Sequence, residues 1–127
     1  MFPMDISDGP LALISQGGNI GVAMVADASV RGVGFRYYVS CGCAADIRIE
    51  DYVEYMGNDD TVKVIMVYIE GLSEDNRFIE KVSKVTLKKP VIVLKPGKTE
   101  AAAKAISSHS GSMAGLDSIY EIGRAHV

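Results

Sequence analysis

The hydrophobic positions of this chain form continuous runs, separated by segments in which apolar residues recur at wider spacing. VKVIMVYIEG (62–71) and KPVIVLKPG (89–97) are nearly unbroken apolar runs, LALIS (11–15) is a shorter one, and FRYYVS (35–40) is aromatic and β-branched. Such runs are typical of strands, and unbroken runs are typical of strands covered on both faces. We therefore predict four strands in these ranges, with 62–71 and 89–97 buried.

The segments between the runs have the spacing of helices. Within 47–57, Ile47, Tyr52 or Val53, and Met56 share one face, and Gly57 is a natural stop. The segment 73–86 begins with S-x-x-N and has acidic residues in its first turn, with apolar residues at helical spacing. We predict helices at 20–28, 47–57, 73–86 and 99–106, and the start of another at 112–120.

Strands and helices are thus expected to alternate along the whole chain. This alternation predicts βαβ units and a parallel sheet covered on both faces, the α/β doubly wound class of flavodoxin-like or Rossmann-like folds. In such folds, ligands bind beyond the carboxyl ends of the strands. The candidate site therefore consists of the segments SQGGN, SCGCAAD, YIEG and KPGKT, which follow the four predicted strands.

Two of these strand ends carry candidate chemistry. The glycines of SQGGNIG allow backbone N–H groups to face an anion at a helix start, although the same residues also suit a simple tight turn. Glu70 follows a buried strand, where a carboxylate is costly unless it has a partner such as an imidazole. The alternative for Glu70 is a side chain that has just reached solvent or that caps the next helix.

His109 lies in SSHSGSMAG, among small and hydroxylated residues, and a helix is predicted shortly after it. A neutral imidazole beside a helix N-terminus is suited to carry a phosphoryl group as a nucleophile. The alternative is an ordinary surface histidine. Other phosphate and hydrolase motifs are missing: the chain has no G-x-S-x-G, no Walker A spacing and no acidic cluster typical of a receiver domain.

Composition narrows the class of protein further. The 127 residues carry a net charge of −3 with scattered lysines, which does not favour nucleic acid as a partner. No apolar run approaches the ~20 residues needed to span a membrane, and the first residues lack a basic signal-peptide region. Cys41 and Cys43 are interpreted as small residues near a strand end rather than as metal ligands, which suits a reducing, cytoplasmic setting.

Taken in order, GPLALISQGGNIG, VSCGCAADI, VIMVYIEG and KKPVIVLKPGKTEAAAKAISSHSGSMAG resemble the second flavodoxin-like domain of NDP-forming acyl-CoA synthetases. This family includes ADP-forming acetate–CoA ligases and the succinyl-CoA synthetase α subunit. The resemblance implies a three-layer α/β/α fold of the succinyl-CoA synthetase domain type over residues 8–121. It also implies acid–thiol ligase activity in a larger multidomain enzyme, of which this fragment alone would be inactive.

The resemblance implies roles for single residues. His109 matches the histidine that is transiently phosphorylated between nucleotide and acyl phosphate, and Glu70 matches the glutamate that holds its imidazole. The residues matching the phosphate-binding positions are Ser15, Gln16, Gly17, Gly18, Asn19, Ser110 and Gly111. Coenzyme A and ATP or ADP are then substrates of the full enzyme, with Mg²⁺ entering with the nucleotide outside this domain.

The resemblance also implies partners: a CoA-binding domain, an ATP-grasp domain or subunit, and a small carboxylic acid as substrate. Two departures stand out, because Gly17 replaces the second serine of the family's S-Q-S-G, and Cys41 and Cys43 occupy a leucine–glycine–asparagine segment. One alternative is a ligand-sensing domain of a protein lysine acetyltransferase, although retention of His109 and Glu70 weighs against it. Another is a free flavodoxin-like module that binds a phosphate ligand.

The last six residues, 122–127, form a separate case. Their sequence IGRAHV back-translates to the opening of a common sequencing adapter, so we interpret them as a non-native tail. His126 would then carry no biological role, and the domain proper would end near residue 121.

Overall fold

The computed structural model describes residues 6–44, 46–73, 75–97, 101 and 104. Its elements, in chain order, are β1 (Leu11–Ser15), α1 (Gly18–Val30), β2 (Phe35–Ser40), α2 (Ile49–Gly57), β3 (Val64–Tyr68), α3 (Arg77–Thr86) and β4 (Val91–Leu94). The predicted alternation is confirmed for these four strands and three helices. Apart from Ala101 and Lys104, the predicted helical segments 99–106 and 112–120 lie outside the described residues.

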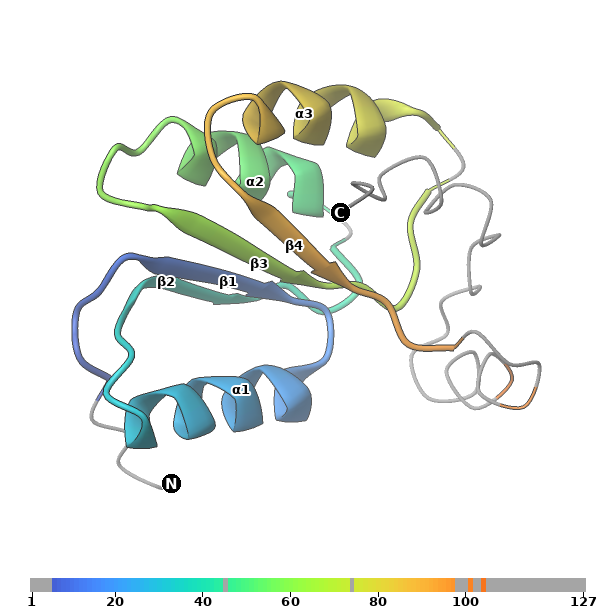
Figure 1. Ribbon diagram of the computed structural model, residues 1–127. Coiled ribbons are helices and arrows are strands. Elements are labelled where there is room, and N and C mark those ends of the chain that lie inside the picture. Colours follow the sequence, from blue (N-terminus) through green and yellow to red (C-terminus); the bar gives the residue numbers. More distant parts are fainter. Residues whose placement is uncertain (1–5, 45, 74, 98–100, 102–103, 105–127) are drawn as a thin grey trace.

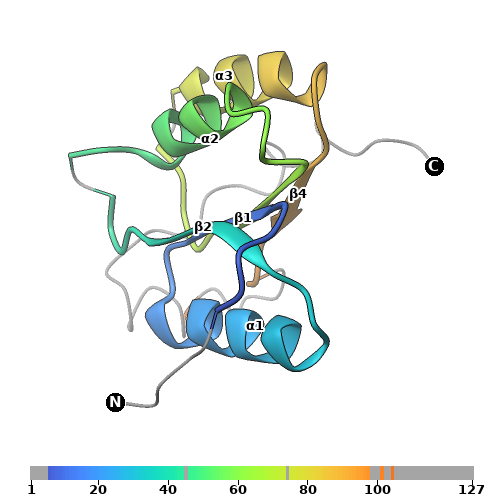
Figure 2. The ribbon, with the colours of Figure 1, turned by 90° about the vertical axis from the view of Figure 1, so that its left-hand side faces the viewer.

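The strands form one parallel sheet in the order β2-β1-β3-β4. Helix α1 covers one face of the sheet, and α2 and α3 lie side by side over the other (Figures 1 and 2). Right-handed crossovers require this arrangement, because the chain moves outward from β1 to β2 and then returns past β1 to β3. The predicted doubly wound, three-layer α/β/α fold is therefore confirmed.

The core is divided by the sheet into two unequal parts. Beneath α1, Leu13, Val25 and Phe35 form a small cluster. The larger cluster fills the space between the sheet and the other two helices, and it consists of Ala12, Ile14, Ile49, Val53, Met56, Val62, Ile65, Val67, Ile69, Phe78, Val82 and Val85. The central strand β1 contributes to both, since its side chains alternate between the two faces.

The second helix ends where it was predicted to end, at Gly57, but it starts later than predicted. It starts at Ile49 rather than at residue 47, and Ile47 is 51% exposed, so Ile47 does not belong to the buried face. Gly57 is the last helical residue, and it also allows a close contact. A Cβ at Gly57 would lie 2.7 and 2.8 Å from the two γ-carbons of Val85, so the glycine allows α2 and α3 to approach closely.

The third helix starts at Arg77, four residues after the predicted start. Asn76 is the N-cap residue, and the hydroxyl of Ser73 instead accepts a hydrogen bond of 2.5 Å from the guanidinium of Arg48. The apolar pattern is confirmed: Phe78, Val82 and Val85 are buried and Ile79 packs against them.

The prediction that 89–97 is a buried strand is wrong. Ile92, Val93 and Leu94 of β4 are 55%, 39% and 50% exposed. β4 is the last strand in the order of the described sheet. On the face of the sheet opposite α2 and α3, helix α1 contacts β1 and β2. In β3 the buried side chains, Ile65 and Val67, alternate with partly buried ones. An unbroken apolar run thus did not distinguish a central strand from an outer one.

Candidate site at the carboxyl edge of the sheet

The candidate site lies where the chain reverses its direction of travel across the sheet. β1 and β3 are hydrogen-bonded neighbours, yet the helix after β1 lies on one face and the helix after β3 lies on the other (Figure 1). The helices that follow β1 and β3 therefore start from the same edge of the sheet toward opposite faces. Doubly wound sheets bind ligands at such a switch point.

Gly17 and Glu70 meet at this point from the two loops. A Cβ added to Gly17 would lie 3.1 Å from Oε1 of Glu70 and 3.0 Å from Cε1 of Tyr68. The carboxylate of Glu70 thus packs against the bare backbone of the glycine loop. Burial, followed by the charge of Glu70, raises the pKa of the neighbouring Tyr68.

The start of α1 lies at the same edge. Gly17 is the N-cap residue, and among the described residues no side chain caps the helix or places an acidic group in its first turn. Gly18 and Asn19 are exposed. Uncapped N–H groups and the helix dipole give this end partial positive charge, which favours an anion.

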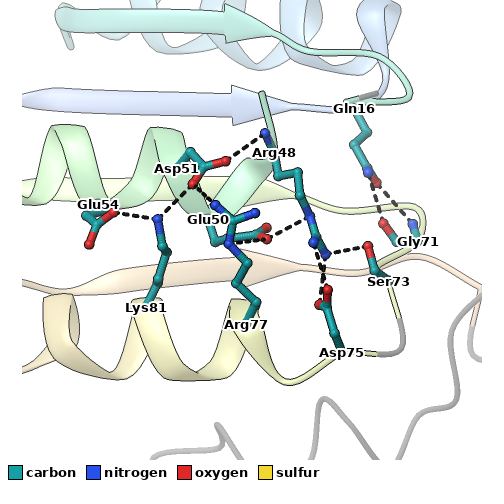
Figure 3. A network of polar contacts seen from close by, with 10 residues as sticks. All are labelled: Gln16, Arg48, Glu50, Asp51, Glu54, Gly71, Ser73, Asp75, Arg77 and Lys81. Atoms are coloured by element: carbon teal, nitrogen blue, oxygen red, sulfur yellow. Dashed lines mark hydrogen bonds and ion pairs between the residues drawn. The ribbon is translucent and has the colours of Figure 1, made fainter. Parts of the chain in front are cut away.

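The two polar residues before Gly17 are used inside the protein. Ser15 is fully buried, and its hydroxyl donates a 2.7 Å hydrogen bond to the carbonyl of Gly17, which fixes the turn. The carboxamide of Gln16 donates to the carbonyl of Gly71 and accepts from its backbone N–H (Figure 3), and it also accepts from the backbone N–H of Glu70. The sequence indicated both residues as candidates for phosphate contact and contained no signal for these internal bonds.

Cys41 lies directly after β2 at the same edge. Its backbone N–H donates to the carbonyl of Ser15 at 2.9 Å, and its Sγ lies 3.4 Å from the same oxygen. Burial raises the pKa of the Cys41 thiol, so the thiol form is favoured over the nucleophilic thiolate. The position at a strand end is as predicted, and Cys41 contributes to closing the β1 turn.

An ion-pair network that the sequence analysis missed joins the starts of α2 and α3 (Figure 3). Glu50 is 1% exposed and lies 2.8 Å from Nε of Arg48, whose other two nitrogens bind both oxygens of Asp75. Arg77 and Lys81 of α3 reach Asp51 of α2. Glu50 is buried beside Arg48, the N-cap residue of its own helix, with Arg77 of α3 further away at 3.9 Å, and a buried carboxylate requires such partners.

Three predicted site residues, His109, Ser110 and Gly111, lie outside the described residues. The structure brings together Ser15, Gln16, Gly17, Gly18 and Asn19 with Glu70 at one edge. Over the described ranges, no set of three or more His, Cys, Asp and Glu side chains is arranged to hold a metal ion. In the same ranges, no helix has the length and apolarity required to cross a membrane.

Comparison with known proteins identifies the family of the chain. The succinyl-CoA ligase like flavodoxin domain family matches residues 8–123. The α subunit of acetate–CoA ligase [ADP-forming] I from Pyrococcus furiosus is 42% identical over 118 residues, which cover 93% of this chain and 26% of that protein. The acetate–CoA ligase [ADP-forming] of Methanocaldococcus jannaschii is 44% identical over 113 residues, 89% of this chain and 16% of that protein.

A solved structure has the same fold as this chain. Ca. Korarchaeum cryptofilum dinucleotide forming acetyl-coenzyme A synthetase 1, in complex with phosphate and ADP, superimposes with a TM-score of 0.85 at 40% identity and covers 94% of this chain. The chain spans about a quarter or less of the length of these relatives. With its parallel sheet, its glycine loop and the family match over nearly its whole length, the chain belongs to the succinyl-CoA ligase like flavodoxin domain family.

Proposed function

We propose that this chain is the phosphohistidine-bearing domain of an NDP-forming acyl-CoA ligase of the acetate type. The observation that carries the proposal is the meeting of Glu70 with the glycine loop and the uncapped start of α1 at the switch point. This pairing supplies an acceptor for an imidazole N–H beside a donor surface for phosphate. The relatives named for ADP-forming ligase activity support the same proposal.

The proposed reaction moves one phosphoryl group twice. A nitrogen of His109 attacks the terminal phosphorus of the nucleotide, so that an N–P bond forms, a P–O bond breaks and the nucleoside diphosphate leaves. A carboxylate oxygen of the acid then attacks the same phosphorus, and the N–P bond breaks as an acyl phosphate forms. Finally, the thiol sulfur of coenzyme A attacks the acyl carbon, so that a C–S bond forms and the C–O bond to phosphate breaks. The departing phosphate takes the proton of the thiol.

The residues of this chain have distinct tasks in that reaction. Glu70 accepts a hydrogen bond from the imidazole N–H that is not phosphorylated, which orients the ring and stabilises its positive charge. Gly17, Gly18 and Asn19 present backbone donors to the phosphate, while Ser15 holds the turn in place. Ser110 and Gly111 are proposed as the corresponding donors beside His109. This arrangement places positive partial charge where the transferred phosphoryl group carries negative charge.

The remaining components belong to the whole enzyme. We propose that a CoA-binding domain and an ATP-grasp domain or subunit complete it, since the chain covers only 26% of the Pyrococcus furiosus subunit and 16% of the single-chain relative. The nucleotide, with its Mg²⁺, and coenzyme A are expected to bind mainly on those parts. A small carboxylic acid is the expected substrate, and a cytoplasmic setting is expected.

The test uses the full-length enzyme together with its ATP-grasp domain or subunit. After incubation with γ-labelled ATP and Mg²⁺, the protein should carry a phosphoryl label that is released by acid and resists alkali. His109→Ala should abolish the label and Glu70→Gln should reduce it. Glu80→Gln, which changes an exposed glutamate on α3, serves as the matched control and should label normally. Label that persists in His109→Ala would contradict the proposal.

A further inference from the structure

The side chain of Gln16 is directed entirely toward the segment that carries Glu70. Its Nε2 donates to the carbonyl of Gly71 at 2.9 Å, and its Oε1 accepts from the N–H groups of Gly71 at 3.0 Å and of Glu70 at 2.5 Å. The backbone N–H of Gln16 donates to the carbonyl of Tyr68 at 3.1 Å. We call the three side-chain bonds the Gln16 bridge; Figure 3 shows its bonds to Gly71.

The bridge continues the pairing of β1 and β3 beyond the ends of the strands. The strand pairing itself ends at Ser15 and Tyr68. A carboxamide has the same donor and acceptor groups as a peptide unit, so Gln16 supplies the partner that a further strand residue would supply. As a result, the backbone of Glu70 and Gly71 is held by a residue more than fifty positions earlier in the chain.

Holding this backbone fixes where the carboxylate of Glu70 can lie. The residue follows the fully buried Ile69, whose N–H is bonded to the carbonyl of Leu94. The N–H of Glu70 is bonded to Gln16, so the backbone is held at both Ile69 and Glu70. The Oε1 atom of Glu70 in turn packs against Gly17. A functional side chain requires such support, because small displacements of a reacting group greatly reduce rates.

We propose that Gln16 acts as the positioning residue for Glu70, rather than as a ligand of the phosphate. This inference rests on the proposed function, because it assigns Gln16 a task in the phosphorylation of His109. It also divides the glycine loop into two parts: Gln16 faces the carboxylate-bearing segment, and the backbone from Gly17 onward faces the anion.

The experiment compares Gln16→Met with Glu70→Gln and with the double variant, in the full-length enzyme with its ATP-grasp partner. Methionine keeps the length and packing of glutamine but cannot form the bridge. The rate of His109 phosphorylation, measured by rapid quench, should fall about tenfold in Gln16→Met, as when a partner that orients a functional group is lost. Because Gln16 acts through Glu70, the double variant should be no slower than Glu70→Gln alone.

A second measurement separates positioning from phosphate binding. In the reverse reaction, from acyl-CoA, ADP and inorganic phosphate, Gln16→Met should lower kcat and leave the KM for phosphate unchanged. Gln16→Glu, which retains an acceptor for the two N–H groups, should recover part of the lost rate. Hydrogen exchange at the amides of Glu70 and Gly71 should accelerate in Gln16→Met. Exchange at the other amides, measured in the same experiment, reports that the rest of the domain remains folded.

Lys89→Met is the matched control. Lys89 also fixes a backbone segment through its side chain, since its Nζ donates to the carbonyls of Asp59 at 2.7 Å and Val62 at 2.9 Å, at the opposite edge of the sheet. Its loss should leave phosphorylation unchanged. A raised KM for phosphate in Gln16→Met, or a rate loss in the double variant equal to the product of the single losses, would overturn the assignment. If wild-type His109 takes no label, the proposed function itself fails.

Discussion

Over its described residues, the domain holds one sheet between two very different helical layers. In α1, thirteen residues long, Gly21 and Val25 are the buried residues, and the Arg31–Asp27 ion pair at its C-terminal end is exposed. In the opposite layer, α2 and α3 bury most of the apolar core and are joined by the network around the buried Glu50. The first layer leaves a helix start accessible at the site, whereas the second secures the sheet and the loop that follows β3.

The difference is confined to the start of α1, because further along this helix a Cβ at Gly21 would lie 2.7 Å from the hydroxyl oxygen of Tyr38, as close as the contact at Gly57. A Cβ at Gly57 would clash with Val85 of the neighbouring helix, but a Cβ at Gly18 of α1 would lie 3.9 Å from Oγ of Ser40, at an ordinary contact distance. Close packing and ion pairing stabilise a rigid frame. A helix that must present its N-terminus to a ligand requires the opposite, namely space and donors without intramolecular partners.

The largest effect is expected from weakening the pairing of Glu50. Arg48→Met removes the guanidinium 2.8 Å from this buried carboxylate and leaves it the more distant Nε of Arg77, at 3.9 Å. The cost should be about 3 kcal/mol of unfolding free energy, which urea denaturation can measure.

Two controls sharpen this comparison of layers. Arg31→Met breaks an exposed pair on α1 and should leave the urea midpoint unchanged. Arg48→Met combined with Glu50→Met removes both charges and should recover most of the loss. Equal destabilisation by Arg48→Met and Arg31→Met would contradict the assignment of stability to the α2–α3 layer.

The next effect concerns helix packing. Gly57→Ala places a methyl group within 3.0 Å of both γ-carbons of Val85 and should cost about 1–3 kcal/mol through overpacking. Gly18→Ala, on the open layer, should change stability by less than about 0.5 kcal/mol, because the gain in helix propensity is small at a helix start. Combining Gly57→Ala with Val85→Ala should relieve the clash, and failure of that rescue would show that α2 and α3 do not meet at this point.

A smaller effect is expected in acid. Hydrogen bonds from Thr61, then from Tyr37, lower the pKa of Asp59 from 3.8 to about 2. A carboxyl group whose pKa is lower in the folded state stabilises that state above its unfolded pKa, and the stabilisation is lost as pH falls from 3.8 to about 2. Asp59→Asn should flatten the fall in urea midpoint over this range, whereas Asp60→Asn, its exposed neighbour, should leave the slope as in the wild type.

The smallest effect lies at the alkaline end. The hydroxyl of Tyr37 donates a 2.7 Å hydrogen bond to Asp59, and this bond raises the pKa of Tyr37 to about 12. The neutral phenol is thus favoured in the folded state, and its contribution should disappear as pH rises from 10.0 to about 12. Ultraviolet titration should show a late-ionising tyrosine that Asp59→Asn shifts to lower pH; an unchanged titration would contradict the bond.

The sequence predicted the elements better than their boundaries or their burial. The spacing of Phe78, Val82 and Val85 identified the buried face of α3, yet the helix starts at Arg77, with Asn76 rather than Ser73 at its N-cap. The pattern of β4 predicts a buried strand, although Ile92 and Leu94 are exposed in the described part. Capping and burial depend on neighbours that are distant in sequence, which local patterns do not record.

The residues of the candidate site were also predicted only in part. Gly17, Gly18 and Glu70 were selected from sequence because glycines after a strand permit close backbone approach, and a carboxylate after a buried strand requires a partner. The tasks of Ser15 and Gln16 were not predicted, since their hydrogen bonds reach atoms of Gly17, Glu70 and Gly71. The roles of His109, Ser110 and Gly111 stay predictions from the motif alone.

By itself, the sequence determined the alternation of strands and helices, and with it the parallel sheet and the edge at which strand-end residues collect. These follow from periodicity and from the handedness of βαβ crossovers, which are properties of any such chain. Only the tertiary structure decided that Gln16 supports Glu70, that Gly57 admits Val85 and that Glu50 is buried beside Arg48. These contacts depend on how separate elements pack together, and the geometry of packing, rather than the local pattern, selects the partner.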